Sequence, residues 1–200
     1  VSHAEGFPFA GDRMRVVAKF GGTSLGSGDR INRAADSVAD AVAQGHEIAV
    51  VASAMGNTTD DLLDDIEFET DDADRAEIVS MGERTSVRML KAALAARGVD
   101  AVFVEPGSDR WPVFTDESGE LDAEKTEEAA AKLAEELDDV VPVITGFLAE
   151  GPEGNVTTLG RGGSDTTAVM LGNYMTADEV VIVTDVEGVM TGDPHVVEGA

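Results

Sequence analysis

The 200-residue sequence contains no cysteine, which excludes disulfide bonds, thiolate zinc sites and cysteine nucleophiles. Aromatic residues make up 4% of the chain, so a buried core has to be built mainly from Val, Leu, Ile and Ala. No apolar run approaches the length of a membrane span, and the first residues lack the basic and then apolar pattern of a secretion signal. These absences predict a cytoplasmic protein that does not bind membranes.

Basic residues are scarce as well: 14 Lys and Arg stand against 40 Asp and Glu, giving a formal net charge of −26. A surface of this charge repels nucleic-acid backbones and anionic membranes, so neither is an expected partner. Disorder is not the expected cause of the acidity, because 42% of the residues are apolar. Only four of the basic residues are Lys, and we interpret the acidity as that of a halophilic protein whose self-repulsion is screened by salt.

Short β-branched runs alternate with helical patterns from Met14 onwards. The runs predict strands at 15–20, 47–52, 101–105, 141–145 and 180–184. The helical patterns predict helices at 29–44, 77–97, 122–139 and 165–174, and the segments 148–150 and 155–158 predict a small hairpin. This alternation indicates an α/β fold in which helices cover both faces of a mainly parallel sheet. In such a fold, ligands bind beyond the carboxyl ends of the strands.

The first of these strand ends carries Lys19-Phe20-Gly21-Gly22-Thr23-Ser24. Two glycines let backbone N–H groups approach an oxyanion closely, and Lys19 would reach the same phosphate. The lysine precedes the glycines, which distinguishes this segment from a Walker A loop. A tight turn that binds nothing is the alternative interpretation.

Small polar side chains follow the second predicted strand, in Ser53-Ala54-Met55-Gly56-Asn57-Thr58-Thr59. They suit a carboxylate or an amino group, although Ser53 and Thr59 would equally serve as caps of the next helix. Further along, Glu83 would bind a substrate ammonium, or it is one more of the 40 acids. Gly82 interrupts the helical pattern there, which argues against a continuous helix.

A second glycine-rich segment precedes the last predicted helix, Gly160-Arg161-Gly162-Gly163-Ser164-Asp165-Thr166-Thr167. Its glycines and the helix N-terminus, with Ser164 as the expected N-cap, make a second anion site. Arg161 suits a carboxylate, and Asp165 would orient cationic groups. Two such segments in one chain indicate a phosphoryl group held between them. Beyond the last strand, Asp185 would bind a ribose hydroxyl or form a turn.

Together with Met81-Gly82-Glu83 and Thr184-Asp185-Val186-Glu187-Gly188-Val189, these motifs occur in the order and approximate spacing of aspartate kinases, and the chain resembles that family from Met14 onwards. The resemblance implies the amino-acid kinase fold, a three-layer αβα sandwich. It also implies ATP-dependent phosphorylation of the side-chain carboxylate of L-aspartate to 4-phospho-L-aspartate, with Mg²⁺ bridging the phosphates. That reaction is the first step towards lysine, methionine and threonine. A homo-oligomer is expected for the full-length form.

The same resemblance implies a role for each motif residue. Lys19 is the implied catalytic lysine that neutralises phosphate charge, and Asp165 the acid that organises it. The residues implied to hold aspartate are Ser53, Thr59, Glu83 and Arg161. Those implied at the nucleotide are Gly21, Gly22, Thr23, Ser24, Gly162, Gly163, Ser164, Thr184, Asp185, Asp193 and Pro194. His195 stands where the family usually has Arg, so one expected phosphate contact is missing.

For domain organisation, we expect residues 1–13 to be an unstructured extension and 14–200 a catalytic domain that lacks its C-terminal part and the family's two regulatory ACT domains. Two alternatives stay open. One is a kinase of the same fold that acts on glutamate, acetylglutamate, carbamate or UMP, against which segments 53–56 and 160–167 favour aspartate. The other is a non-catalytic fragment. The acidic run 60–77 is expected to be a solvated face, because it lacks the spacing of a calcium loop.

Overall fold

The computed structural model describes residues 12–160 and 162–184. Within these residues the elements follow in the order β1 (Arg15–Phe20), α1 (Gly22–Leu25), α2 (Gly28–Ala43), β2 (Glu47–Ala52), α3 (Thr58–Asp64), α4 (Asp72–Ala95), β3 (Ala101–Val104), α5 (Ala123–Ala134), β4 (Val141–Thr145), β5 (Leu148–Glu150), β6 (Val156–Thr158), α6 (Gly163–Tyr174) and β7 (Glu179–Val183). All five predicted strands are present, and their bounds agree with the prediction to within one residue. The short helix α1 was not predicted.

Five strands form one parallel sheet in the order β3-β4-β2-β1-β7. β1 lies between β2 and β7, and its last residue, Phe20, is paired with Ala52 of β2 and with Val183 of β7. β5 and β6 pair separately as an antiparallel hairpin, as predicted. Because every strand of the main sheet runs in the same direction, all the carboxyl ends meet at one edge, where the predicted motifs lie.

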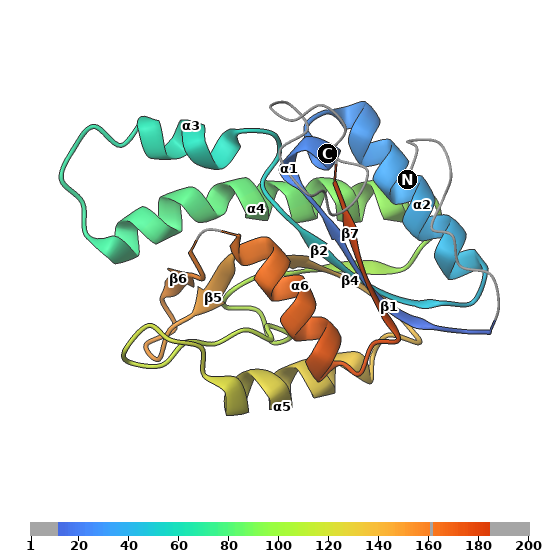
Figure 1. Cartoon of the computed structure of the whole chain (residues 1–200). Helices are drawn as coiled ribbons and strands as arrows, with labels where there is room; N and C mark the ends of the chain where they lie inside the picture. Colours follow the sequence, from blue (N-terminus) through green and yellow to red (C-terminus); the bar gives the residue numbers. More distant parts are fainter. Residues whose placement is uncertain (1–11, 161, 185–200) are drawn as a thin grey trace, which may run out of the picture.

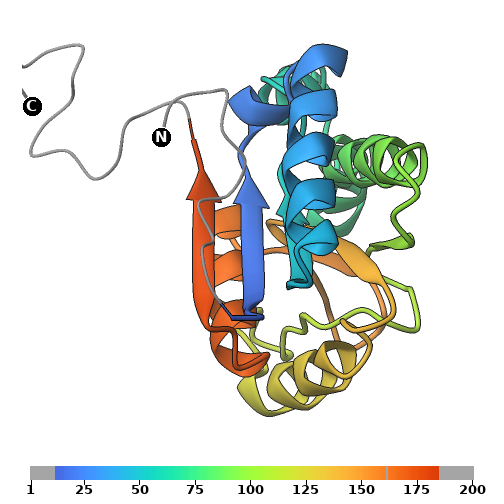
Figure 2. The ribbon, with the colours of Figure 1, turned by 90° about the vertical axis from the view of Figure 1, so that its right-hand side faces the viewer.

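Helices cover both faces of this sheet, which confirms the three-layer α/β architecture (Figures 1 and 2). Side chains of β1 alternate between two cores. Val16, Ala18 and Phe20 pack into a core with residues of α2 and α4. Val17 packs into the other core, with residues of α5 and α6. Lys19 follows the alternation of Val17 and therefore points to the α6 face.

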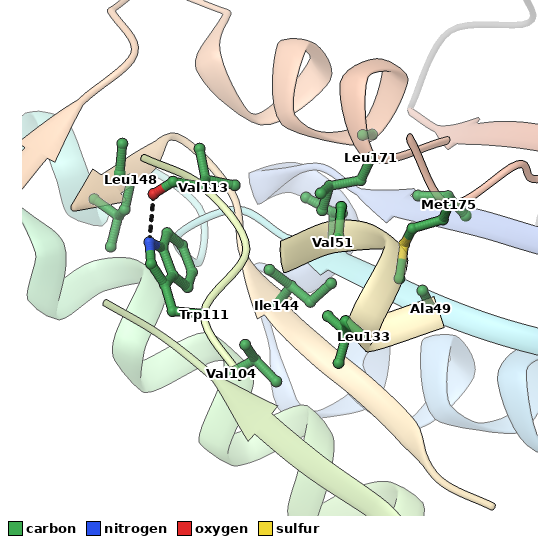
Figure 3. Close-up of a cluster of buried hydrophobic side chains, with 14 of the residues drawn as sticks. Ala49, Val51, Val104, Trp111, Val113, Leu133, Ile144, Leu148, Leu171 and Met175 are labelled. Atoms are coloured by element: carbon green, nitrogen blue, oxygen red, sulfur yellow. Dashed lines mark hydrogen bonds between the residues drawn. The ribbon is translucent and has the colours of Figure 1, made fainter. Parts of the chain in front are cut away.

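The second core contains the single tryptophan of the chain, Trp111, which is 3% exposed. Its indole Nε1 donates a hydrogen bond to the carbonyl oxygen of Val113, so the polar end of the ring is satisfied (Figure 3). Ile144 of β4, Leu133 of α5 and Leu171 of α6 are fully or almost fully buried in the same cluster. This packing fixes α6 against the sheet and so positions its N-terminus.

Three expectations about helix ends and breaks were wrong, although the helix predicted over 77–97 is present within α4. α4 runs through Gly82 without interruption, because the glycine serves close packing: a Cβ at this position would lie 2.7 Å from the Cβ of Ala54. α6 is preceded by Gly162 in the left-handed conformation, with φ of +77°, so Ser164 is not its N-cap. Likewise the N-cap of α3 is Asn57, and neither Ser53 nor Thr59 takes that position.

The acidic run lies on α3, the following loop and the start of α4. All ten of its acids are exposed, which confirms a solvated face. In the described part of the chain, no group of three or more His, Cys, Asp or Glu residues is arranged to hold a metal ion. None of the helices there is both long and apolar enough to cross a membrane.

Candidate active site

A cavity of about 230 Å³ opens at the carboxyl edge of the sheet. Its walls come from the end of β1, the segments that follow β2 and β4, the start of α3, the middle of α4 and the start of α6. The lining residues are Lys19, Ser53, Thr59, Glu83, Phe147, Gly160, Gly162, Gly163, Ser164 and Asp165. The fold thus brings together all the residues predicted to act in catalysis or to hold aspartate, apart from Arg161, which lies outside the described residues.

Lys19 and Asp165 form an ion pair in this cavity. The Nζ atom of Lys19 lies 2.7 Å from Oδ1 of Asp165, in the first turn of α6. Lys19 is only 9% exposed, whereas the side chain of Asp165 is 55% exposed. A Cβ at Gly21 would lie 3.4 Å from the same Nζ atom, so the ammonium is next to the first glycine segment. A buried cation is therefore held between the two glycine-rich segments.

The glycine at position 22 has a packing role of its own. A Cβ there would lie 2.7 Å from the carbonyl oxygen of Gly56 and 2.9 Å from that of Ala54. The N–H of Gly56 also donates to the Gly22 carbonyl oxygen at 2.9 Å. Gly22 therefore allows the segment after β1 to touch the segment after β2, and its presence does not by itself indicate phosphate binding.

The segment after β1 is also tied to the end of β7. The N–H of Gly21 and the hydroxyl of Ser24 both donate to the carbonyl oxygen of Val183, each at 3.3 Å. Thr23 and Ser24 lie on α1, a helix of four residues, and neither lines the cavity. Thr184, the residue after β7, is exposed and does not line it either.

Glu83 projects from α4 into the base of the cavity and is 3% exposed. Its Oε1 accepts a hydrogen bond from the backbone N–H of Ala54 at 3.3 Å. Burial raises the pKa of the carboxyl to about 7, while hydrogen bonds from backbone N–H groups and the Thr59 hydroxyl oppose the rise. Oε2 has no hydrogen-bond partner among the residues that the structure describes. The ionised form of such a buried carboxyl would be stabilised by a cationic group of a ligand.

The second glycine segment packs against Phe147. A Cβ at Gly163 would lie 2.9 Å from Cδ2 of Phe147 and 3.0 Å from its Cα. Phe147 has a φ of +68°, a left-handed conformation that is uncommon for a bulky residue. Its N–H donates a hydrogen bond to the hydroxyl oxygen of Thr167 at 3.2 Å, and its carbonyl oxygen accepts one from the N–H of Leu159 at 2.8 Å, which hold it in this conformation.

Phe147 is a cavity residue that the sequence motifs did not identify, whereas Gly160 belongs to the second glycine segment but had no assigned role. The available signal was Gly146, directly after the fourth predicted strand, which is one of the strand ends where ligands are expected. Four of the predicted site residues, Arg161, Asp185, Asp193 and Pro194, lie outside the described residues, as does His195.

The sequence model of the amino acid kinase family matches residues 14–200. The chain belongs to the amino acid kinase family. Curated relatives include an aspartokinase of Thermus thermophilus, 42% identical over 190 residues, and aspartokinase 2 of Bacillus subtilis, 37% identical over 190 residues. Each alignment covers 92% of this chain and 46% of the relative, so the chain spans about half the length of these proteins.

Solved structures of the family share the fold described above. Aspartokinase III of E. coli, in complex with aspartate and ADP, has a TM-score of 0.78 and 29% sequence identity. The match covers 92% of this chain and 52% of that one. The aspartate kinase of Synechocystis has a TM-score of 0.72 and 33% identity, over 91% of this chain and 30% of that one.

Proposed function

We propose that the chain is the part of an aspartate kinase that binds substrates and transfers the phosphoryl group of ATP to the side-chain carboxylate of L-aspartate. The observation that carries the proposal is the meeting of Lys19, Asp165 and Glu83 in one cavity at the carboxyl edge of the sheet. The relatives named aspartokinase support it, because their alignments cover 92% of this chain.

Phosphoryl transfer to a carboxylate needs charge neutralisation more than proton transfer. An oxygen of the aspartate side chain attacks the γ-phosphorus, a new O–P bond forms, and the bond to the β-phosphate oxygen breaks to release ADP. The attacking carboxylate is already ionised at neutral pH, so no general base has to remove a proton. Lys19 would offset the charge on the transferred group, and Asp165 would hold its ammonium in place.

Aspartate itself would be held by the opposite wall of the cavity. Its ammonium group would pair with Glu83 and with the oxygen of Thr59, whose hydroxyl donates to Glu83, and the hydroxyl of Ser53 would donate to one of its carboxylates. Arg161 would pair with one carboxylate, which leaves the other free to attack. The pairing of a buried acid with the ammonium would select an amino acid with a free α-amino group, which excludes an N-acetylated substrate.

The nucleotide would extend from the first glycine segment towards the residues after β7, with Gly21, Gly22 and the start of α6 at its phosphates. Mg²⁺ would be held mainly by the phosphates, as is usual for this ion, because the described residues contain no cluster of three potential protein ligands. We extend the proposal to a cytoplasmic, salt-adapted enzyme of lysine, threonine and methionine synthesis. Its full-length form would be a homo-oligomer.

Release of ADP from ATP in the presence of Mg²⁺ and each candidate acceptor, in molar KCl, tests the proposal, and hydroxamate formation shows that the product is an acyl phosphate. L-Aspartate is the expected acceptor, whereas turnover of glutamate, acetylglutamate, carbamate or UMP in its place would overturn the substrate assignment. The absence of L-aspartate turnover by the 200-residue chain would favour the alternative of a non-catalytic chain.

A further inference from the structure

Three buried side-chain oxygens lack hydrogen-bond partners in the described part of the chain: Oε2 of Glu83, Oγ of Ser86 and Oγ1 of Thr145. The residues that carry them are almost completely buried. Buried polar groups without partners are rare in folded proteins, and each one requires an explanation. Here two of the three are on α4, and that helix packs against β4, which ends at the third.

Their positions follow from the elements that carry them. Ser86 is three residues after Glu83 on α4, so the two side chains lie on the same face of the helix. Thr145 ends β4 and lies beside Ala52, the last residue of β2. Val143 and Ala52 face the core that contains Val87 and Leu90 of α4. Two residues beyond Val143, the side chain of Thr145 faces α4 as well.

Glu83 reaches the same place from the helix side, because it accepts the N–H of Ala54, two residues beyond Ala52. Although Glu83 lines the cavity, its Oε2 atom is inaccessible to solvent. This oxygen is therefore enclosed by the protein, on a side chain whose other oxygen binds the segment after β2. Among the described residues, the buried hydroxyls without a hydrogen-bond partner are those of Ser86 on α4 and Thr145 at the end of β4.

The three oxygens are not bonded to one another, so a small group that both accepts from hydroxyls and donates to a carboxylate is needed between them. A water molecule meets this requirement, and buried waters typically bind two to four otherwise unpaired polar groups. We infer that Glu83, Ser86 and Thr145 enclose an internal water site behind the cavity. Through this water, the two hydroxyls hold Glu83 in the orientation that receives the substrate ammonium.

The charged side chains near Glu83 are paired with other residues or exposed, so they do not hold its carboxylate in place. Arg84, the next residue, is turned away and pairs with Glu77 and Glu105 at 3.5 and 3.3 Å. Lys19 on β1 pairs with Asp165 on α6. The acids of α3 nearest to the cavity, Asp60 and Asp61, are exposed. Hydrogen bonds donated by Ser86 and Thr145 through a water would therefore add to the stabilisation that the ionised Glu83 receives from the N–H of Ala54 and the Thr59 hydroxyl.

The water site is tested by the pKa of Glu83 in Ser86→Ala and Thr145→Val variants. The ¹³C NMR signal of the side-chain carboxyl reports it in protein labelled at Glu, with Glu83→Gln to assign the signal. Loss of either hydroxyl is expected to raise the pKa by about one pH unit. Thr126→Val is the matched control, because Thr126 is equally buried but its hydroxyl already accepts from the N–H of Phe114. This control should leave the Glu83 signal unchanged.

An unchanged pKa in both variants, with a higher melting temperature for Thr145→Val, would overturn the inference. That result would mean that no water binds the two hydroxyls and that their burial without a partner only destabilises the fold. The positioning role rests on the proposed function and has its own measurement, a rise of about tenfold in the KM for L-aspartate with kcat nearly unchanged. A protein that does not phosphorylate aspartate would refute the proposed function, while the NMR titration would still decide the water site.

Discussion

The ammonium of Lys19 lies 2.7 Å from a carboxylate oxygen of Asp165, and this ion pair joins the end of β1 to the first turn of α6. Each residue belongs to one of the two glycine-rich segments. The pair therefore fixes the distance between the two parts of the chain that would hold the phosphoryl group. Since the acceptor carboxylate needs no base, the position of Asp165 fits the orientation of Lys19 better than it fits proton removal.

Replacement of either partner should separate their roles. Lys19→Met removes the positive charge at the phosphoryl group, and we expect kcat to fall by about 10²–10³-fold. Asp165→Ala should lower kcat less, because Lys19 keeps its charge and loses only its orientation, with little change in the KM for aspartate. Initial rates over a range of aspartate concentrations measure both. Lys132→Met, on the exposed face of α5, is the control. A rise in KM with kcat intact in either variant would contradict these roles.

Glu83 should make the stability of the fold depend on pH. Below about pH 4.5 its carboxyl is protonated in both states, and between 4.5 and about 7 only the folded state retains the proton. Stability contributed at this site is therefore lost as the pH rises through that interval. The Glu83→Gln variant cannot ionise at this position. Its free energy of unfolding, relative to that of the wild type, should therefore increase from pH 5 to pH 8 by up to roughly 3 kcal/mol.

Urea denaturation of the wild type and of Glu83→Gln at several pH values, all in molar KCl, measures this difference. Because the other titrating groups are the same in both proteins, their contributions cancel. An equal difference in the free energy of unfolding at pH 5 and pH 8 would refute the raised pKa.

The sequence predicted the sheet well because its signals are local. Each strand of the main sheet is a short β-branched run, and the side chains that line the cavity follow the ends of these runs or lie on the helices between them. The approach of Lys19 to Asp165 was anticipated from the chemistry of the two glycine segments and from the resemblance to aspartate kinases. Nothing in the spacing of residues 146 positions apart predicts a contact.

The errors arose where tertiary packing decides. Gly82 weakens a helix by intrinsic preference, yet the helix continues because Ala54 of a distant segment occupies the space of its missing side chain. Phe147 adopts a left-handed conformation that no propensity suggests, because Gly163 and Thr167 of α6 lie against it. Such contacts join segments that are far apart in the sequence, so they can be identified only in the folded structure.

A substitution at Gly82 tests that packing. Alanine is the better helix former by about 1 kcal/mol, but the added Cβ would lie 2.7 Å from the Cβ of Ala54. We expect Gly82→Ala to destabilise the fold by ~1–3 kcal/mol, as overpacking does, and to raise the KM for aspartate by shifting Glu83. Gly28→Ala is the matched control, since a Cβ there meets nothing within 4 Å. Urea denaturation that finds Gly82→Ala as stable as the control would contradict this role.

Removal of salt should unfold the protein. At 1 M salt the Debye length is about 3 Å, whereas at 0.01 M it is about 30 Å, so repulsion within a chain of net charge −26 grows steeply on dilution. Trp111 is the single tryptophan and is buried, so its fluorescence should shift to longer wavelength as KCl falls from molar to millimolar concentrations.

Replacement of Asp60, Asp61, Asp64 and Asp65 by Asn neutralises four exposed acids of α3 and its end. This variant should unfold at a lower KCl concentration than the wild type. Sucrose, which does not screen charge, should not replace KCl. A wild type that keeps its fluorescence and circular dichroism in millimolar salt would refute the salt-adapted surface.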